Sequence, residues 1–180
     1  MLRVTDLQFG YDAPLARGLN FTIEAGTIRL LHGPSGCGKS SLLAILSGTA
    51  DKNLKWCGKI TLDGVEIGHM PAAQRGVGLM FQDPLLFPHM TVGDNLAFGL
   101  RAAQSGRAER LQAVLDALHE CGLDDFAGRD PASLSGGQKA RVALMRALLA
   151  APKMLLLDEA FSSLDPDLRQ TLGKFVASQV

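Results

Sequence analysis

The sequence has no net charge and few cysteines, and each of these shortages excludes a class of protein. Lys and Arg number 18, as do Asp and Glu, so no general attraction to nucleic acid or to an anionic membrane surface is expected. The three cysteines, Cys37, Cys57 and Cys121, have neither zinc-ligand nor redox-pair spacing, and an odd count argues against a disulfide framework. The composition predicts a protein of a reducing cytoplasm.

Long apolar runs are also lacking. The first ten residues, MLRVTDLQFG, contain no apolar core of signal-peptide length, which argues against secretion. The richest apolar stretch, residues 142–157, is interrupted by Arg146, Pro152 and Lys153, which argues against a membrane span. If the protein works at a membrane, we expect it to dock there through a partner.

The apolar pattern of the 180 residues predicts one domain of the α/β class. A small antiparallel sheet is expected at the front, and a hairpin with Asp63 and Gly64 at its turn is expected later. Between them, a strand should lead through a glycine loop into a helix. The expected strands cover residues 4–9, 19–23, 27–32, 59–67 (the hairpin), 76–81 and 154–157, and the expected helices cover residues 40–46, 92–121 and 138–150.

The segment GPSGCGKS, residues 33–40, matches the phosphate-binding pattern GxxxxGK[S/T] between an expected strand and an expected helix. Glycines allow successive N–H groups to turn inward, and the helix N-terminus adds positive partial charge near a bound phosphate. Lys39 would reach the β- and γ-phosphates, Ser40 would coordinate Mg²⁺, and Ser41 would donate to the α-phosphate. A structural glycine turn is the alternative. The predicted nucleotide-binding residues here are Gly33, Pro34, Ser35, Gly36, Cys37, Gly38, Lys39, Ser40 and Ser41.

A second chemical signal is the apolar run MLLLDE, residues 154–159, which ends in two carboxylates. A buried strand ending in an acid is the usual second half of a P-loop metal site, so Asp158 would hold Mg²⁺ through water. Glu159 would polarise the attacking water as general base. The alternative for Glu159 is an acid that is merely solvated at a strand end.

The segment LSGGQ, residues 134–138, resembles the signature of ABC-type ATPases. Ser135, Gly136 and Gly137, followed by Gln138, would form a second anion cradle at a helix N-terminus, and one monomer has no use for two cradles on one phosphate chain. The resemblance implies a RecA-like P-loop NTPase core with a small N-terminal antiparallel β lobe and a helical lobe. It also implies ATP and Mg²⁺ as ligands, and a head-to-tail homodimer with each ATP between one P-loop and the partner's signature.

The same resemblance suggests roles for other positions. Gln82 corresponds to the glutamine that touches Mg²⁺ and the attacking water, unless it is only a polar strand end. Tyr11 corresponds to the aromatic residue that stacks on adenine, with Phe9 as competitor and simple packing as the alternative. Residues 162–165, SSLD, resemble the loop that bridges the two sites of the dimer, and they would also serve as a helix N-cap before Pro166.

Residues 71–100 resemble ATPases of bacterial importers, with LFPHMTV as the most specific phrase. The resemblance implies that the chain hydrolyses ATP at the cytoplasmic face of the membrane to energise import of a small solute through a separate permease, with a substrate-binding protein in the same system. Leu86, Phe87 and Pro88 are candidate permease contacts, although Phe87 would equally suit buried packing. One ABC ATPase domain is expected over residues 1–180, with a core and β lobe at 1–82 and 150–180 and a helical lobe at 83–149.

Two alternatives remain open. A non-transport ABC ATPase acting on DNA or ribosomes fits less well, because Lys39 and Ser135 are only 96 residues apart (135 minus 39) and the charge is neutral. The second is a nucleotide-binding fragment with little turnover. The family has a switch histidine about thirty residues after the position of Glu159, but only 21 residues (180 minus 159) follow it here. We therefore expect a truncated chain whose central sheet lacks the strand carrying that histidine. Ala160, where the family has proline, should loosen the turn.

Overall fold

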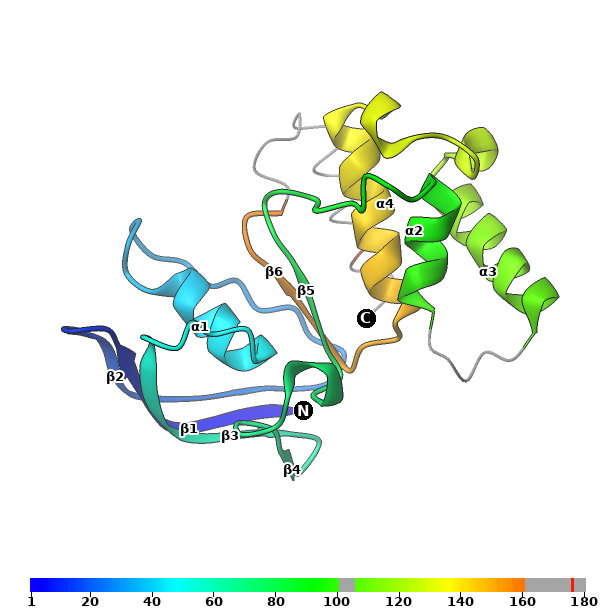
Figure 1. Ribbon diagram of the computed structural model, residues 1–180. Helices are drawn as coiled ribbons and strands as arrows, with labels where there is room; N and C mark the ends of the chain where they lie inside the picture. The colour runs from blue at the N-terminus through cyan, green and yellow to red at the C-terminus, as the bar shows by residue number, and fades with distance from the viewer. Residues whose placement is uncertain (101–105, 161–175, 177–180) are drawn as a thin grey trace. The chain divides into compact units, whose positions relative to one another are not determined.

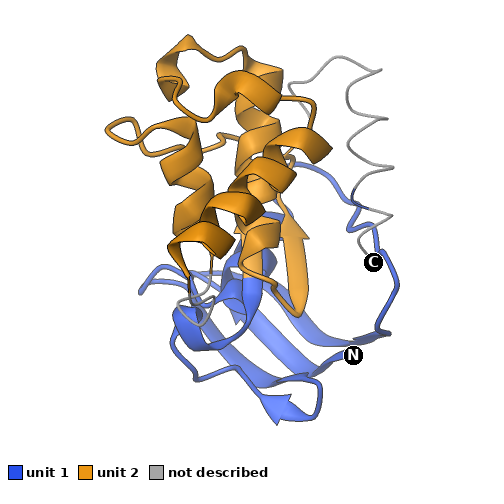
Figure 2. Ribbon diagram, turned by 90° about the vertical axis from the view of Figure 1, so that its right-hand side faces the viewer, with its two compact units in different colours: residues 1–77, 175–180 blue, residues 78–174 orange. Residues whose placement is uncertain are grey.

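The computed structural model describes residues 1–100, 106–160 and 176. The chain divides into two compact units, Met1–Val77 with Phe175–Val180, and Gly78–Lys174 (Figure 2). Strand 154–157 pairs with strand 77–80 and belongs to the same unit as the helices, whereas the expected boundaries at residues 82 and 150 stay a prediction. Residues 162–165 and the helix expected from Asp165 onward lie outside the described residues.

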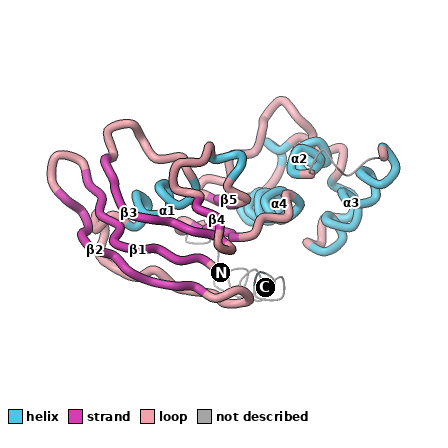
Figure 3. The backbone as a smooth tube through the Cα atoms, turned by 90° about the horizontal axis from the view of Figure 1, so that it is seen from below, coloured by secondary structure: helices cyan, strands magenta, loops and turns pink. Residues whose placement is uncertain are grey.

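The first unit contains a four-stranded sheet in the order β2-β1-β3-β4, with every pairing antiparallel (Figure 3). Its strands are β1 (Leu2–Gly10), β2 (Pro14–Ile23), β3 (Lys55–Leu62) and β4 (Val65–Glu66). Leu62 pairs with Val65, and the intervening Asp63 and Gly64 have φ values of 51° and 79°, as a tight hairpin turn requires. The predicted front sheet and hairpin are both confirmed.

Helix α1 (Lys39–Ser47) follows the glycine loop, as predicted, and buries Leu42, Ile45 and Leu46. It ends at Gly48, which has φ 82° and donates its N–H to the carbonyls of Ala44 and Ile45. This left-handed residue is the usual way to satisfy the last carbonyls of a helix.

Buried Arg75, just after the short 3₁₀ turn η1 (Ala72–Gln74), also contacts the end of α1. Its guanidinium donates to the carbonyls of Ile45 at 2.6 Å and Leu46 at 3.2 Å, and to those of Gly68 at 2.7 Å and Met70 at 2.9 Å. Burial lowers the pKa of Arg75 from the ordinary arginine value. The cation therefore sits at the negative end of the α1 dipole and holds the helix to the segment that follows the hairpin.

The strand predicted at residues 27–32 does not form, which corrects the sequence-based expectation. Ile28, Leu30 and Leu31 are instead 60%, 90% and 44% exposed. An apolar, β-branched run indicates strand propensity, but a strand also needs a neighbouring strand to accept and donate its backbone hydrogen bonds. No such neighbour pairs with this run among the described residues, and the acidic strand pairs elsewhere.

The second unit contains a two-stranded sheet of β5 (Val77–Met80) and β6 (Met154–Leu157). Asp158 N donates to Met80 O at 2.9 Å, so the residue after β6 meets the last residue of β5. The two strands therefore run in the same direction, and their carboxyl ends lie together. Both strands were predicted from their apolar runs.

The described part of this unit also contains the helices α2 (Val92–Gly99), α3 (Arg107–Glu120) and α4 (Gly136–Leu149), with 3₁₀ turns η2 (Asp124–Phe126) and η3 (Pro131–Ser133) between α3 and α4 (Figure 1). The helical insert predicted at residues 92–121 is thus two helices, α2 and α3. Helix α2 packs against both α3 and α4. An added Cβ on Gly99 would overlap the carbonyl oxygen of Arg146, so this glycine permits the close crossing of α2 and α4.

Within the part of the chain that the structure describes, no helix combines the length and the apolar character needed to cross a bilayer.

Candidate nucleotide-binding site

The glycine loop ends at Gly38, which is the N-cap of α1 and has φ 95°. A side chain at Gly38 would be strained by this angle, and its Cβ would lie 3.0 Å from Phe9 Cε2 and 3.3 Å from Leu15 Cβ. Only glycine therefore lets the loop turn into the helix while lying against the front sheet. The N–H groups of the first turn of α1 have no intrahelical acceptor and are available to an anion.

Lys39 is the first residue of α1, and its side chain folds back over the loop. Its Nζ donates to the carbonyl oxygens of Gly33 and Pro34, each at 2.9 Å. Among the described residues, no carboxylate forms an ion pair with this ammonium group. The cation is thus held at the loop by neutral acceptors, and phosphate oxygens would provide stronger, charge-assisted hydrogen bonds.

Most of the other residues predicted in this loop are exposed. Ser40 and Ser41 occupy the first turn of α1, with Ser40 exposed, and Ser35, Gly36 and Cys37 are exposed. Tyr11 is 47% exposed, whereas Phe9 is 5% exposed and contacts the loop. Of these two aromatic side chains, only Tyr11 has an exposed surface, and its stacking on adenine stays a prediction.

Three of the predicted metal and base residues, Gln82, Asp158 and Glu159, follow the carboxyl ends of β5 and β6. Asp158 is half-buried and directly follows β6, while Gln82 follows β5 by two residues and is exposed. Glu159 is exposed and has φ 48°, a left-handed angle that costs a non-glycine residue about 1 kcal/mol. Backbone strain of this kind often marks functional positions. Ala160 is only 4% exposed, so its side chain packs inside the turn.

The signature segment forms the N-terminus of α4 through a capping box. Ser135 Oγ accepts from Gln138 N at 3.3 Å, and Gln138 Oε1 accepts from Ser135 N at 2.9 Å. Gly136 and Gly137 are the first two helical residues, and a Cβ on Gly136 would meet nothing within 4 Å. The space beside Gly136 is therefore open, and the N–H groups of Gly136 and Gly137, which have no intrahelical acceptor, are the ones that a phosphate group would meet.

The glycine loop and Tyr11 belong to the first unit, and Gln82, Asp158, Glu159 and the signature belong to the second. Within the second unit, Gln82, Asp158 and Glu159 follow the paired ends of β5 and β6. No cluster of three or more His, Cys, Asp or Glu side chains suited to a metal occurs among the described residues. The side-chain oxygens of Ser40 and Asp158 are both of the hard type that Mg²⁺ prefers, and their role as its ligands stays a prediction.

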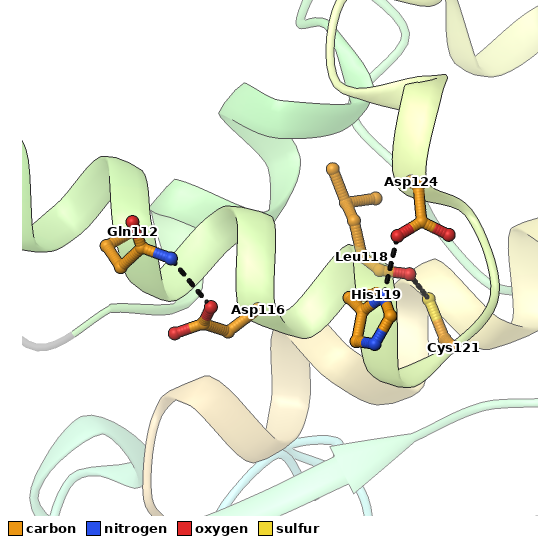
Figure 4. A network of polar contacts seen from close by, with 6 residues as sticks. All are labelled: Gln112, Asp116, Leu118, His119, Cys121 and Asp124. Carbon is orange, nitrogen blue, oxygen red and sulfur yellow. Dashed lines mark hydrogen bonds and ion pairs between the residues drawn. The ribbon is translucent and has the colours of Figure 1, made fainter.

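The sequence indicated no role for His119 and Cys121, and in the structure both make polar contacts at the end of α3 (Figure 4). His119 Nδ1 lies 2.7 Å from Asp124 Oδ1, and this hydrogen bond raises the pKa of His119 and lowers that of Asp124. Cys121 Sγ lies 3.4 Å from the carbonyl oxygen of Leu118, and burial raises the pKa of its thiol to about 11. A partly buried thiol with a raised pKa is a poor nucleophile at neutral pH.

Sequence reasoning missed two polar residues of the second unit, Asn95 and Arg146. Asn95 is fully buried, and both residues make hydrogen bonds to the backbone of residues 84–91. The only sequence signal was their polarity at positions where α2 and α4 otherwise have apolar residues.

Comparison with known proteins agrees with these motifs. The family described as ABC transporter matches residues 16–162. YnjD of Escherichia coli K12, named an uncharacterized ABC transporter ATP-binding protein, is 48% identical over 169 residues, which are 94% of this chain and 77% of that protein.

Two spermidine/putrescine import ATP-binding proteins named PotA are similar as well. The protein from Pasteurella multocida is 44% identical over 89% of this chain and 43% of its own length. The protein from Hahella chejuensis is 43% identical over 96% of this chain and 47% of its own length. The chain thus spans less than half the length of these two relatives. The family match and the extent of these similarities show that the chain belongs to the ATP-binding proteins of ABC transporters, a family of P-loop ATPases.

Proposed function

We propose that this chain binds and hydrolyses MgATP to energise import of a small solute through a separate membrane permease. The observation that carries the proposal is Lys39, the one cation of the glycine loop, which is held over that loop by the neutral carbonyls of Gly33 and Pro34. When ATP binds, Nζ exchanges these two acceptors for β- and γ-phosphate oxygens, and the N–H groups at the start of α1 donate to the same phosphates.

The other residues take roles that their positions permit. Ser40 and Asp158 would hold Mg²⁺, and the ion would neutralise phosphate charge. Glu159 accepts a proton from the attacking water, and Gln82 orients that water from the neighbouring strand end. Tyr11 stacks on the adenine with its exposed ring.

The second anion-binding helix end supports a homodimer. Ser135, Gly136 and Gly137 of one copy would contact the γ-phosphate of the ATP held by the other copy. A head-to-tail arrangement uses both phosphate-binding ends of each chain, and its two identical interfaces close the assembly.

A permease contact is supported by apolar side chains of the loop 84–91 and of α2. Phe98 is 62% exposed and Leu85 53% exposed, and the rings of Phe87 and Phe98 meet edge to face with centroids 4.7 Å apart. We place the chain at the cytoplasmic face of the membrane, with a substrate-binding protein as a further component. The names of the PotA relatives make polyamines one candidate solute class.

Nucleotide titration tests the proposal. Lys39→Ala should weaken binding of MgATP by at least about tenfold, because a charge-assisted hydrogen bond to phosphate is lost. Lys59→Ala is the matched control, since Lys59 is an exposed lysine of the same unit, 3.9 Å from Glu66. Equal affinity of the wild-type chain and Lys39→Ala would reject the proposed role of the loop. If the wild-type chain binds MgATP but turns it over very slowly, the alternative of a nucleotide-binding fragment gains support.

A further inference from the structure

Arg146, on the helix that begins at the signature, reaches across to the loop that follows Gln82. Its Nη2 donates to the carbonyl oxygens of Pro84 at 3.2 Å and Leu85 at 3.0 Å. Its guanidinium carbon also lies 5.1 Å from the centre of the Phe87 ring. One side chain of α4 thus contacts three residues of the segment between Gln82 and α2.

Asn95 of α2 holds the same loop from a second side. Its Oδ1 accepts from Phe87 N at 2.8 Å and from Arg146 Nη1 at 3.2 Å. Its Nδ2 donates to the carbonyls of Phe87 at 3.1 Å and Thr91 at 3.0 Å. Both backbone groups of Phe87 are therefore bonded to one buried amide, and that amide is bonded to Arg146.

The conformation held by these two residues is strained. Leu85 has φ 46°, a left-handed angle for a branched apolar residue, and its carbonyl is one of the acceptors of Arg146. Its own N–H lies 3.3 Å from Asp83 Oδ1. A strained turn persists only where surrounding contacts stabilise it, and Arg146 provides such contacts here.

Gln82 lies between two fixed points. On one side, Met80 is bonded to Asp158 through the pairing of β5 with β6. On the other side, Pro84 is bonded to Arg146. Only residues 81–83 separate these anchors, so the freedom of Gln82 depends on whether Arg146 holds Pro84 and Leu85.

We propose that Arg146 is a positioning residue that fixes the strained turn at Pro84–Leu85 and thereby sets the position of Gln82. Through this contact, Arg146 links the signature helix α4 to the loop that carries Gln82. This inference rests on the proposed function for its effect on catalysis, but not for the hold on the loop. The link is direct, because Gly99 allows α2 and α4 to cross closely at Arg146 and Asn95 joins both helices to the loop.

Hydrogen exchange of backbone amides tests the hold without nucleotide or membrane partner. Arg146→Met keeps much of the side-chain volume but removes every donor, and exchange in residues 85–91 should rise by about tenfold or more, while amides within α2 and α4 keep their protection. Arg110→Met is the matched control, because Arg110 also donates to a carbonyl of α2, that of Ala97 at 2.9 Å, which lies outside the loop 84–91. If Arg146→Met fails to fold, Arg146→Lys replaces it, since one ammonium group cannot bridge Asn95 and two carbonyls in the same geometry.

Unchanged exchange in residues 85–91 would overturn the proposal, and so would an equal rise throughout the helices, which would indicate general destabilisation. The kinetic arm compares Arg146→Met with the wild type in MgATP hydrolysis. We expect kcat to fall by about tenfold with KM for ATP nearly unchanged, because misplacing a water-orienting residue affects the transition state more than binding. A raised KM with unchanged kcat would contradict the link to Gln82. Absence of turnover in the wild-type chain would count against the proposed function, and the exchange result would still decide whether Arg146 holds the loop.

Discussion

Gly48 and Arg75 lie so close that a Cβ on Gly48 would be 2.6 Å from Nε and 2.8 Å from Cζ of the arginine. Arg75 has little freedom to move, because its guanidinium is bonded to the carbonyls of Ile45 and Gly68 as well as two others. The end of α1 and the buried arginine are therefore mutually dependent.

We expect Gly48→Ala to lower the free energy of unfolding by about 2–4 kcal/mol, since it combines a left-handed alanine with displacement of a buried cation. Gly64→Ala is the matched control: Gly64 has φ 79°, close to the 82° of Gly48, but a Cβ there meets nothing within 4 Å. It should cost only about 1 kcal/mol of backbone strain. Urea denaturation measures the free energy of unfolding of both variants. Equal losses in the two would show that the contact with Arg75 adds nothing to the cost of Gly48→Ala.

Glu159→Gln should trap the proposed dimer, because the amide cannot accept the proton of the attacking water and bound ATP persists. Sedimentation velocity with MgATP should then show a dimer that is absent without nucleotide. The double variant Lys39→Ala/Glu159→Gln should remain monomeric, since the loop no longer holds the phosphates. A Glu159→Gln chain that is saturated with MgATP yet monomeric would count against the arrangement with two shared sites.

The apolar side chains of the loop 84–91 and of α2 should contact the permease. A cysteine placed at Phe98 or Phe87, in a chain whose exposed Cys37 and Cys57 are replaced by serine, should cross-link to co-expressed membrane subunits from neighbouring genes. Leu111 is a suitable control position, because it is 58% exposed, close to the 62% of Phe98, but belongs to α3. Cross-links from Leu111 alone would move the interface to α3.

The pair His119 and Asp124 should make a small, pH-dependent contribution to stability. The hydrogen bond raises the pKa of His119, so its contribution is complete below the ordinary histidine value and disappears as pH rises through the raised value. It lowers the pKa of Asp124, so that contribution is complete above the ordinary aspartate value and disappears as pH falls through the lowered value.

Both contributions to stability are complete between about pH 4 and pH 6.5, which are the ordinary pKa values of aspartate and histidine. His119→Gln should therefore differ most from the wild type in that window and least above neutral pH. Thermal unfolding midpoints measured across this range test the pair, and a difference that grows above pH 8 would contradict the assigned sign.

Much of the site was predictable because its residues act through local backbone geometry. The segments GPSGCGKS and LSGGQ each place glycines at the start of a helix, and the structure has α1 and α4 beginning there. The turn at Asp63 and Gly64 was also readable, since two left-handed residues in a row favour one hairpin geometry. The roles of Gln82, Asp158 and Glu159 in turnover remain predictions.

Other features depend on partners distant in the sequence. Residues 27–32 have strand propensity but form no strand, because propensity does not supply the neighbour that completes the hydrogen bonds. Arg146 and Asn95, which together hold the loop, are hydrogen-bonded to each other although they lie 51 positions apart in the sequence. No pattern of spacing indicates such a contact.

The sequence by itself determined the family, the two glycine segments predicted to bind phosphate and the helices that follow them, because glycine angles, capping and apolar period act over a few residues. Only the tertiary structure decided that Phe9 is buried while Tyr11 is exposed, that β6 pairs with β5, and that Arg146 bonds to the loop after Gln82. These outcomes depend on which surfaces meet when distant segments pack, and burial and hydrogen-bond partners are properties of that packing.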